Sequence, residues 1–156
     1  MEIRPIDASD RAALVELLNR IETFSAPEVA CALELIDHAR SRKDHPDYKV
    51  LVAFKHDKLI GYVCYGPTPM TEGTWDLYWI ASDPSVRGQG VGAALVSAME
   101  ADLRARKARL VRVETSATED YGPTRGFYQS MKYVEESRFR DFYKVGDDLI
   151  ILAKRL

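Results

Sequence analysis

Three glycines in a short polar segment are the residues whose spacing points most directly to chemistry. They are Gly88, Gly90 and Gly92, and they follow Arg87 where a β-rich run gives way to a strong helical pattern. The first turn of a helix leaves backbone N–H groups unpaired, with the positive end of the helix dipole behind them. Glycines let an anion approach those groups closely, and an arginine guanidinium matches phosphate oxygens. The segment therefore predicts a pyrophosphate-binding turn.

Two other nucleotide-binding loops and a purely structural turn compete for this segment. A Walker-type loop is excluded because the segment has no Gly-Lys-Ser/Thr ending. A dinucleotide-binding turn fits formally, since Gly88, Gly90 and Ala93 follow its GxGxxG/A pattern, and Glu114 could hold the ribose. However, residues 83–86 separate the turn from its strand, and few residues remain downstream to complete such a sheet. A purely structural interpretation also stays open, in which the glycines only make a tight turn and cap the helix.

Hydrophobic periodicity indicates the elements that must position this turn. Apolar residues four apart from Val91 to Leu103 predict the helix that starts there. Short β-branched and aromatic runs bounded by turn residues predict strands, and a helical period predicts three more helices. The predicted strands are 3–6, 48–54, 59–65, 74–82, 109–115, 133–139 and 149–153. The predicted helices are 8–21, 27–40, 90–107 and 124–131.

This order predicts an α/β fold in which helices cover both faces of a mixed, mostly antiparallel central sheet of about seven strands. The strands 74–82 and 109–115 should pair in parallel, because a helix connects them. A turn at Gly146, Asp147 and Asp148 should separate the last two strands. With 156 residues and 46% hydrophobic content, the chain is expected to form a single domain over residues 1–156.

Composition excludes several classes of partner. A formal charge of -2 provides no excess of positive charge for a nucleic acid or an anionic membrane. No run approaches the roughly 20 apolar residues of a membrane span, and residues 1–5 lack a signal-peptide core. Cys31 and Cys64 have no metal-binding spacing and are expected to be buried thiols in a reducing compartment. The histidines also lack metal-ligand spacing, so we expect a cytoplasmic protein without a metal site.

The turn and a second motif together resemble the GNAT acetyltransferases. Arg87, Gly90 and Gly92 are spaced as in that family's Arg/Gln-x-x-Gly-x-Gly/Ala signature, after an aromatic strand that ends in Asp-Pro. Further along the chain, residues 127–133 are similar to the family's Phe/Leu-Tyr-x-x-x-Gly-Phe helix. The order of the predicted elements is also that of the family. The resemblance therefore covers nearly the whole chain.

The resemblance implies that acetyl-coenzyme A lies in a V-shaped opening between the strands 74–82 and 109–115. Strand-end backbone would bind its pantetheine arm, and the glycine turn would bind its pyrophosphate. The implied cofactor-binding residues are Ile80, Ala81, Ser82, Arg87, Gly88, Gln89, Gly90, Val91, Gly92 and Ala93. The sequence departs from the family at Tyr121, where an Asn often contacts the cofactor, and at Lys132, where a Gly is usual. The first departure concerns contacts near the thioester, and the second concerns a turn.

The implied reaction is direct transfer of the acetyl group to a primary amine, which needs a base for the amine and an acid for the leaving thiolate. Tyr128 fits the acid, because a phenol is protonated at neutral pH. A packing role like that of the neighbouring Phe127 is its alternative. Two carboxylates are candidates for the base. Asp76 stands where histone-type GNAT enzymes carry a Glu, and Glu114 ends the neighbouring strand.

The alternation of an unbroken strand supports Asp76 as a site residue. It would place Asp76 on one face with Tyr78 and Ile80, and Leu77 and Trp79 on the other. A carboxylate is a poor core residue, so its face should border the site. Glu114 has an equally simple interpretation as a solvated charge at a strand end.

The acceptor stays open between a small molecule and a peptide: a polyamine, an amino acid, an antibiotic and a protein terminus are all candidates. By family analogy, the loop before Trp75, the first two helices and the turn 139–143 would border it. The aromatic residues of that turn lie near Asp141 and Asp147, which could attract a cationic amine. A homodimer also stays open. The main alternative to an enzyme is an acyl-CoA-binding regulatory domain that has kept the fold without transfer activity.

Overall fold

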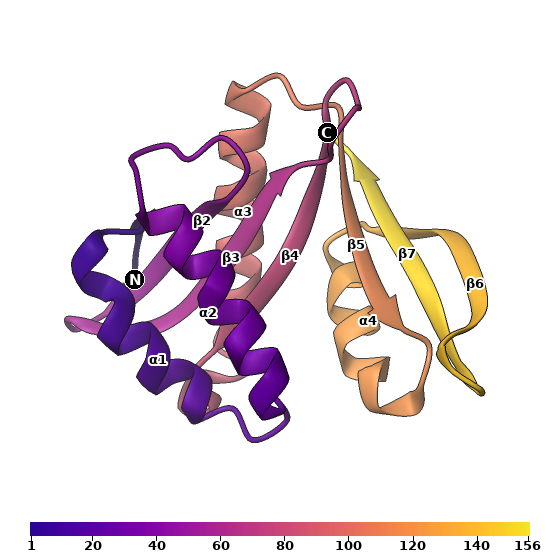
Figure 1. Cartoon of the computed structure of the whole chain (residues 1–156), viewed down its shortest axis with the longest axis horizontal. Helices are drawn as coiled ribbons and strands as arrows, with labels where there is room; N and C mark the ends of the chain where they lie inside the picture. Colours follow the sequence, from indigo (N-terminus) through magenta and orange to yellow (C-terminus); the bar gives the residue numbers. More distant parts are fainter.

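The computed structural model describes all residues from Met1 to Leu156 and contains seven strands and four α-helices (Figure 1). Their order along the chain is the one that hydrophobic periodicity predicts. The strands are β1 (Glu2–Pro5), β2 (Lys49–Lys55), β3 (Lys58–Pro67), β4 (Thr74–Ser82), β5 (Leu110–Ser116), β6 (Val134–Lys144) and β7 (Asp147–Arg155). The helices are α1 (Arg11–Asn19), α2 (Ala26–Arg40), α3 (Val91–Ala105) and α4 (Gly122–Ser130), with 3₁₀ turns η1 (Ala8–Asp10), η2 (Pro84–Val86) and η3 (Glu119–Tyr121).

All seven strands belong to one sheet with the order β1-β2-β3-β4-β5-β7-β6. Every neighbouring pair is antiparallel except β4 and β5, which are parallel and joined through α3. The mixed, mostly antiparallel sheet and the parallel pair at its centre are therefore confirmed. The parallel pair lies between a half built from β1 to β4 and a half built from β5 to β7.

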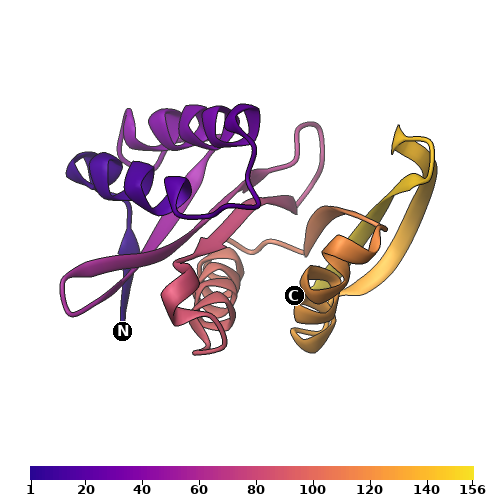
Figure 2. The same ribbon diagram turned by 90° about the horizontal axis from the view of Figure 1, so that it is seen from below.

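Each face of the sheet carries its own apolar core. The first combines α1 and α2 side chains with β2 and β3, and Leu14, Leu18 and Ile36 are fully buried in it. The second combines α3 and α4 with the sheet centre and includes Leu95 and Tyr128. Figure 2 shows α1 and α2 on one side of the sheet and α3 and α4 on the other. None of the helices combines the length and apolar composition that a bilayer crossing requires.

Local signals set the helix starts. Ser25 caps α2 by accepting a hydrogen bond from the Glu28 N–H, and the Glu28 carboxylate accepts one from the Ser25 N–H. Pro27 stands in the first turn, where its missing N–H costs no helical hydrogen bond. In contrast, α3 begins at Gly90, which has no side chain to cap the helix.

Two details of the sequence analysis are wrong. Asp147 and Asp148 belong to β7 and not to the turn before it, because β6 and β7 pair until Lys144 meets Asp147. Cys31 is exposed on α2, whereas Cys64 is buried as expected. The helical period places Cys31 beside the buried Ala32 but turned away from the core.

The predicted alternation along β4 is also wrong, because the strand contains a β-bulge. Cys64 pairs with Trp79 and Tyr65 pairs with Leu77, so Tyr78 has no partner on β3. The extra residue reverses the side-chain alternation beyond it. Leu77 consequently packs in the α3/α4 core while Trp79 packs in the α1/α2 core.

Because of the same bulge, Ile80 packs against the α3/α4 core, so it does not share a face with Asp76 and Tyr78. Tyr78 instead lies beside Tyr48, which packs against the α1/α2 core. A bulge also bends its strand and increases the local twist.

Asp83 anchors the connection between β4 and α3. Its side chain accepts hydrogen bonds from the Ser85 backbone and hydroxyl, and its backbone N–H donates to Ile60. Its carboxylate lies 3.0 Å from Lys58 Nζ and 3.2 Å from Arg20 Nη2. Burial by itself would raise the pKa of Asp83, but these hydrogen bonds and cations outweigh burial and lower the pKa to about 2.

We expect Asp83→Asn to lower the free energy of unfolding by about 2 kcal/mol at neutral pH, because each pKa unit corresponds to about 1.4 kcal/mol. Because folding lowers the pKa of Asp83, its carboxylate stabilises the wild type at pH values above the pKa that Asp83 has in the unfolded chain. This stabilisation is lost as the pH falls toward 2. Urea unfolding between pH 2 and 7 measures both effects. Asp37→Asn is the control, since its pKa is also about 2 but its side chain is 40% exposed, so solvent screening should reduce the loss below about 1 kcal/mol. Equal losses in the two variants would contradict this account.

Candidate active site

A fork between β4 and β5 lies at the centre of the sheet. The two strands pair only over Thr74 to Asp76 and Leu110 to Arg112. Beyond these residues they diverge, as Figure 1 shows between the labels β4 and β5. The β4 bulge falls directly after the last pair and bends β4 away, which accounts for the divergence. The backbone edge of β4 from Leu77 to Ser82 therefore has no strand beside it on the β5 side.

The glycine turn lies at the far end of β4 and leads into α3. Gly88 and Gly90 have φ angles of 76° and 81°, in the left-handed region that favours glycine. No N–H group of Gly88, Gly90 or residues 91–93 donates to a protein acceptor. Arg87 is exposed and has no ion-pair partner. The turn thus presents free N–H donors and a free guanidinium at a helix start, which is the arrangement that binds phosphate groups.

The third glycine of the turn has a different role. A Cβ on Gly92 would lie 3.3 Å from the ring of Phe127 on α4, whereas a Cβ on Gly88 or Gly90 would meet nothing within 4 Å. Gly92 therefore permits close packing of α3 on α4. This contact brings the aromatic start of the second sequence motif next to the turn.

Tyr128 follows Phe127 and is 3% exposed. Its ring packs against Phe127 and Tyr133. Its hydroxyl forms no hydrogen bond within the protein. The hydroxyl of Thr115 also has no partner, but it is completely buried, whereas the Tyr128 hydroxyl is not. Burial raises the pKa of Tyr128 above its ordinary value, so the phenol stays protonated across the physiological range. The side chain can act as a proton donor to a group placed against its hydroxyl.

Asp76 is buried and already has partners. Its carboxylate accepts a hydrogen bond from Arg112 Nε at 2.7 Å and another from the Thr68 hydroxyl at 2.8 Å. Asp76 and Arg112 are also the last register pair of β4 and β5. The ion pair therefore closes the apex of the fork and occupies the Asp76 carboxylate.

Glu114 lies two residues further along β5, where that strand has left β4. Its side chain is 45% exposed, and its Oε1 lies 3.3 Å from Arg112 Nη1. Glu114 and Asp76 thus lie on the same face of the sheet, joined through one guanidinium. Of the two carboxylates, Glu114 is the one that solvent and a small molecule can reach.

Arg112 and Thr68 were not identified from the sequence. Arg112 stands two residues before Glu114 on a strand, so period-two alternation could have placed both on one face. Thr68 carried no comparable signal, because its contact with Asp76 depends on how the loop after β3 returns to β4. Lys132, which stands where the family usually has Gly, has a φ of 71°, so that position is a left-handed turn here as well.

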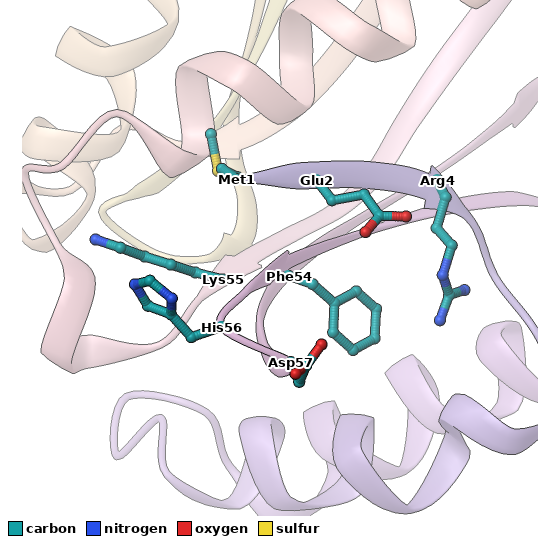
Figure 3. Close-up of a pocket in the computed structure, with 7 residues that line it drawn as sticks. All are labelled: Met1, Glu2, Arg4, Phe54, Lys55, His56 and Asp57. Carbon is teal, nitrogen blue, oxygen red and sulfur yellow. The ribbon is translucent and has the colours of Figure 1, made fainter.

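A surface cavity of about 620 Å³ lies away from these residues (Figure 3). It is lined by Met1, Glu2, Arg4, Phe54, Lys55, His56 and Asp57. It contains none of the candidate catalytic residues, although Lys55 Nζ reaches Gln89 of the glycine turn at 3.4 Å. The fork, where the chemically suited groups meet, is the better candidate site. No group of His, Cys, Asp and Glu side chains has an arrangement that could hold a metal ion.

Comparison with known proteins shows a consistent set of relatives. A family model described as the acetyltransferase (GNAT) family matches residues 12–133. No curated protein sequence matches the chain. A solved structure from Desulfovibrio desulfuricans, described as a GNAT-family acetyltransferase, has 35% sequence identity and a TM-score of 0.94, and the match covers 99% of this chain and 98% of that one.

Two more distant structures share the fold. An aminoglycoside 6'-N-acetyltransferase complexed with coenzyme A has 18% identity and a TM-score of 0.78, with 99% of this chain and 97% of that chain covered. The ribosomal-protein-S18-alanine N-acetyltransferase from Escherichia coli has 20% identity and a TM-score of 0.77, with 99% and 92% covered.

Proposed function

Because the chain belongs to the GNAT acetyltransferase family, we propose that it transfers the acetyl group of acetyl-coenzyme A to a primary amine. The observation that carries this proposal is the fork between β4 and β5, which has free N–H groups suited to phosphate at one end and the unpartnered hydroxyl of Tyr128 on the adjoining α4. A similar fold crystallised with coenzyme A supports this choice of acetyl donor.

The residues around the fork fit the parts of acetyl-coenzyme A. The free N–H groups of Gly88, Gly90 and residues 91–93 and the Arg87 guanidinium suit the pyrophosphate. The free edge of β4 at Ile80, Ala81 and Ser82 suits the amide groups of the pantetheine arm, because an extended amide chain can pair with an open strand edge. This placement leads the thioester toward the apex of the fork, between Glu114 and Tyr128.

In the transfer the acceptor nitrogen loses two protons and the leaving thiolate gains one. Glu114 takes a proton from the acceptor ammonium, and the resulting neutral nitrogen attacks the thioester carbonyl carbon. The C–N bond forms as the C–S bond breaks, and the electron pair of that bond leaves with the sulfur. Tyr128 gives its proton to the thiolate, and the acylated nitrogen, which still carries a positive charge, loses its second proton to restore Tyr128 through solvent. Glu114 releases the first proton to solvent, so the products are an N-acetylated amine, free coenzyme A and one proton.

Glu114 is a better base than Asp76 in this geometry. The Asp76 carboxylate is occupied by Arg112 and Thr68, and its protonation would break a buried ion pair. Glu114 is exposed at the open part of the fork and retains an oxygen that no protein group contacts. Asp76 then acts through Arg112, by holding the guanidinium that contacts Glu114.

Incubation with acetyl-coenzyme A and a panel of amines tests the function, with the mass of each product as the readout. We expect an increase of one acetyl group on at least one primary amine, with release of one thiol for each product. Tight binding of acetyl-coenzyme A without any acetylated product would instead support the regulatory-domain alternative. Preferential binding of NADH would support the dinucleotide alternative.

The phosphate site has a test of its own. We expect Gly90→Asp to weaken acetyl-coenzyme A binding by about tenfold to a hundredfold, because a carboxylate would face the pyrophosphate at short range. Gly90→Ala is the control, since it imposes at least as much left-handed strain without a charge, and a Cβ there meets nothing within 4 Å. Calorimetry on the folded variants should therefore show a smaller loss for Ala. Equal affinities of the Asp and Ala variants would move the pyrophosphate elsewhere.

A further inference from the structure

Three exposed tyrosines surround the mouth of the fork and are not used by the proposed transfer. They are Tyr78 on β4, Tyr121 at the end of η3 and Tyr143 on β6, and they are 37%, 42% and 49% exposed. We call them the tyrosine rim. Figure 2 shows the β6–β7 hairpin curving toward the face that carries α1 and α2, which is also the face of Asp76 and Glu114. Aromatic rings left in solvent beside a candidate site are available to contact a ligand.

Carboxylates lie between these rings. Asp147 accepts a hydrogen bond from the Ser116 hydroxyl, which places it at the end of β5. Burial together with the charges of Glu114 and Asp147 raises the pKa of Tyr143, so both carboxylates lie within electrostatic range of its ring. Burial together with the charges of Glu28 and Asp147 does the same for Tyr121. Glu28 at the start of α2 therefore lies within electrostatic range of Tyr121.

Two arginines of this region are already engaged, whereas a third, Arg140 on β6, forms no ion pair. Arg112 is shared between Asp76 and Glu114, and Arg125 donates to the backbone oxygens of Ser116 and Thr118. Lys144 is opposite Asp147 in the β6–β7 pair but forms no ion pair with it. The rim thus combines aromatic faces with the carboxylates of Glu114 and Asp147, and this combination attracts organic ammonium groups.

The charge of the reacting amine determines which acceptors the rim can favour. The nitrogen that attacks the thioester must be neutral, so an anionic and aromatic rim contributes nothing to a monoamine in its reactive form. A second amino group that stays protonated does benefit, because it keeps its positive charge throughout the reaction. The rim therefore distinguishes acceptors by the charge they keep.

Building on the proposed transfer reaction, we propose that the acceptor is a diamine or polyamine whose second ammonium group binds between Tyr121 and Tyr143 beside Asp147. The first amino group then lies at Glu114, within reach of the thioester. The unpartnered hydroxyl of Tyr128, a residue that is 3% exposed, is a further sign that a ligand enters the fork. Glu28 adds long-range attraction from the start of α2.

The test compares three acceptors: 1,4-diaminobutane, 1-aminobutane and an alanine-initiated peptide without lysine. Rates are referred to the concentration of neutral amine at each pH, which removes differences in amine basicity. We expect kcat/KM for the diamine to exceed that of 1-aminobutane by about tenfold or more, since one cation–π contact and one carboxylate each contribute about 1 kcal/mol. The advantage should shrink as ionic strength rises. Equal values for the diamine and the monoamine, or a preference for the peptide, would overturn the proposal.

Variants at the rim separate recognition from chemistry. Tyr143→Leu and Asp147→Asn should each lower kcat/KM for the diamine by about threefold to tenfold and leave the value for 1-aminobutane unchanged. Glu28→Gln offers a milder test, because Gln can still complete the α2 capping box. Glu34→Gln is the control, an exposed carboxylate further along α2. Equal losses for both amines, or no loss for the diamine, would refute the assigned ammonium site.

Failure of this proposal is distinguishable from failure of the proposed function. Acetylation of 1-aminobutane or the peptide without any preference for the diamine would refute the diamine proposal and leave the acetyltransferase intact. Failure to acetylate any acceptor, with acetyl-coenzyme A bound or unbound, would refute the function itself.

Discussion

Replacing Tyr128 with Phe is expected to lower kcat by about 10²–10⁴-fold, the usual contribution of a positioned general acid. The substitution removes one oxygen and keeps a ring that is 3% exposed in the α3/α4 core. Because the hydroxyl has no partner within the protein, its loss should leave the melting temperature and the affinity for acetyl-coenzyme A nearly unchanged. Steady-state kinetics with an acceptor for which chemistry limits the rate, together with thermal unfolding, measure both quantities.

Tyr133→Phe is the matched control for this prediction. The two rings are in contact, but the Tyr133 hydroxyl donates to the buried Glu100 carboxylate at 3.1 Å. Its removal should cost stability, by about 1–3 kcal/mol for a hydrogen bond to a charged group, and leave kcat intact. A Tyr128→Phe enzyme with wild-type kcat would assign Tyr128 to packing alone.

The raised pKa of Tyr128 also predicts a pH dependence. A general acid works only while it is protonated, and burial shifts its pKa upward. The alkaline fall in kcat that deprotonation of Tyr128 would cause should therefore lie above the ordinary tyrosine pKa of about 10. An alkaline limb near pH 8 in the wild type that persists in Tyr128→Phe would belong to another group.

Replacing Glu114 with Gln is expected to lower kcat/KM by about 10²–10⁴-fold at neutral pH. Without a base, the enzyme depends on amine that is already neutral in solution, and this fraction rises with pH. The deficit should therefore shrink steadily as pH increases toward the pKa of the amine. A pH–rate profile of the wild type and the variant with one acceptor measures it.

Asp76→Asn separates the base from its support. This change removes the negative charge of the buried carboxylate that Arg112 Nε contacts at 2.7 Å and leaves that Nε only a neutral amide as its partner. We expect a loss of stability and a moderate fall in rate that is independent of pH, because the base is still present. If Asp76→Asn shows the pH-dependent deficit and Glu114→Gln does not, Asp76 is the base.

The glycine turn shows how far local sequence can determine a site. Its φ angles, its unpaired N–H groups and the start of α3 depend on glycine and on the apolar stripe that follows, all within one short segment. The parallel pairing of β4 and β5 was predictable for a related reason, because a strand-helix-strand unit favours a parallel crossover. The position of Tyr128 required the resemblance to a family, since a tyrosine on a helix is most often a packing residue.

The chain's residue order therefore determined the elements, their order and the anion-binding turn, since each depends on neighbours along the chain. The tertiary structure alone decided which groups are free to react. The bulge at Tyr78 arises from the register of β4 against β3, and it reversed the faces that alternation predicts. Likewise, Asp76 looked like a free carboxylate until the β4–β5 register placed Arg112 beside it. Such contacts join residues far apart in the chain, and their energies are set only when the strands pair.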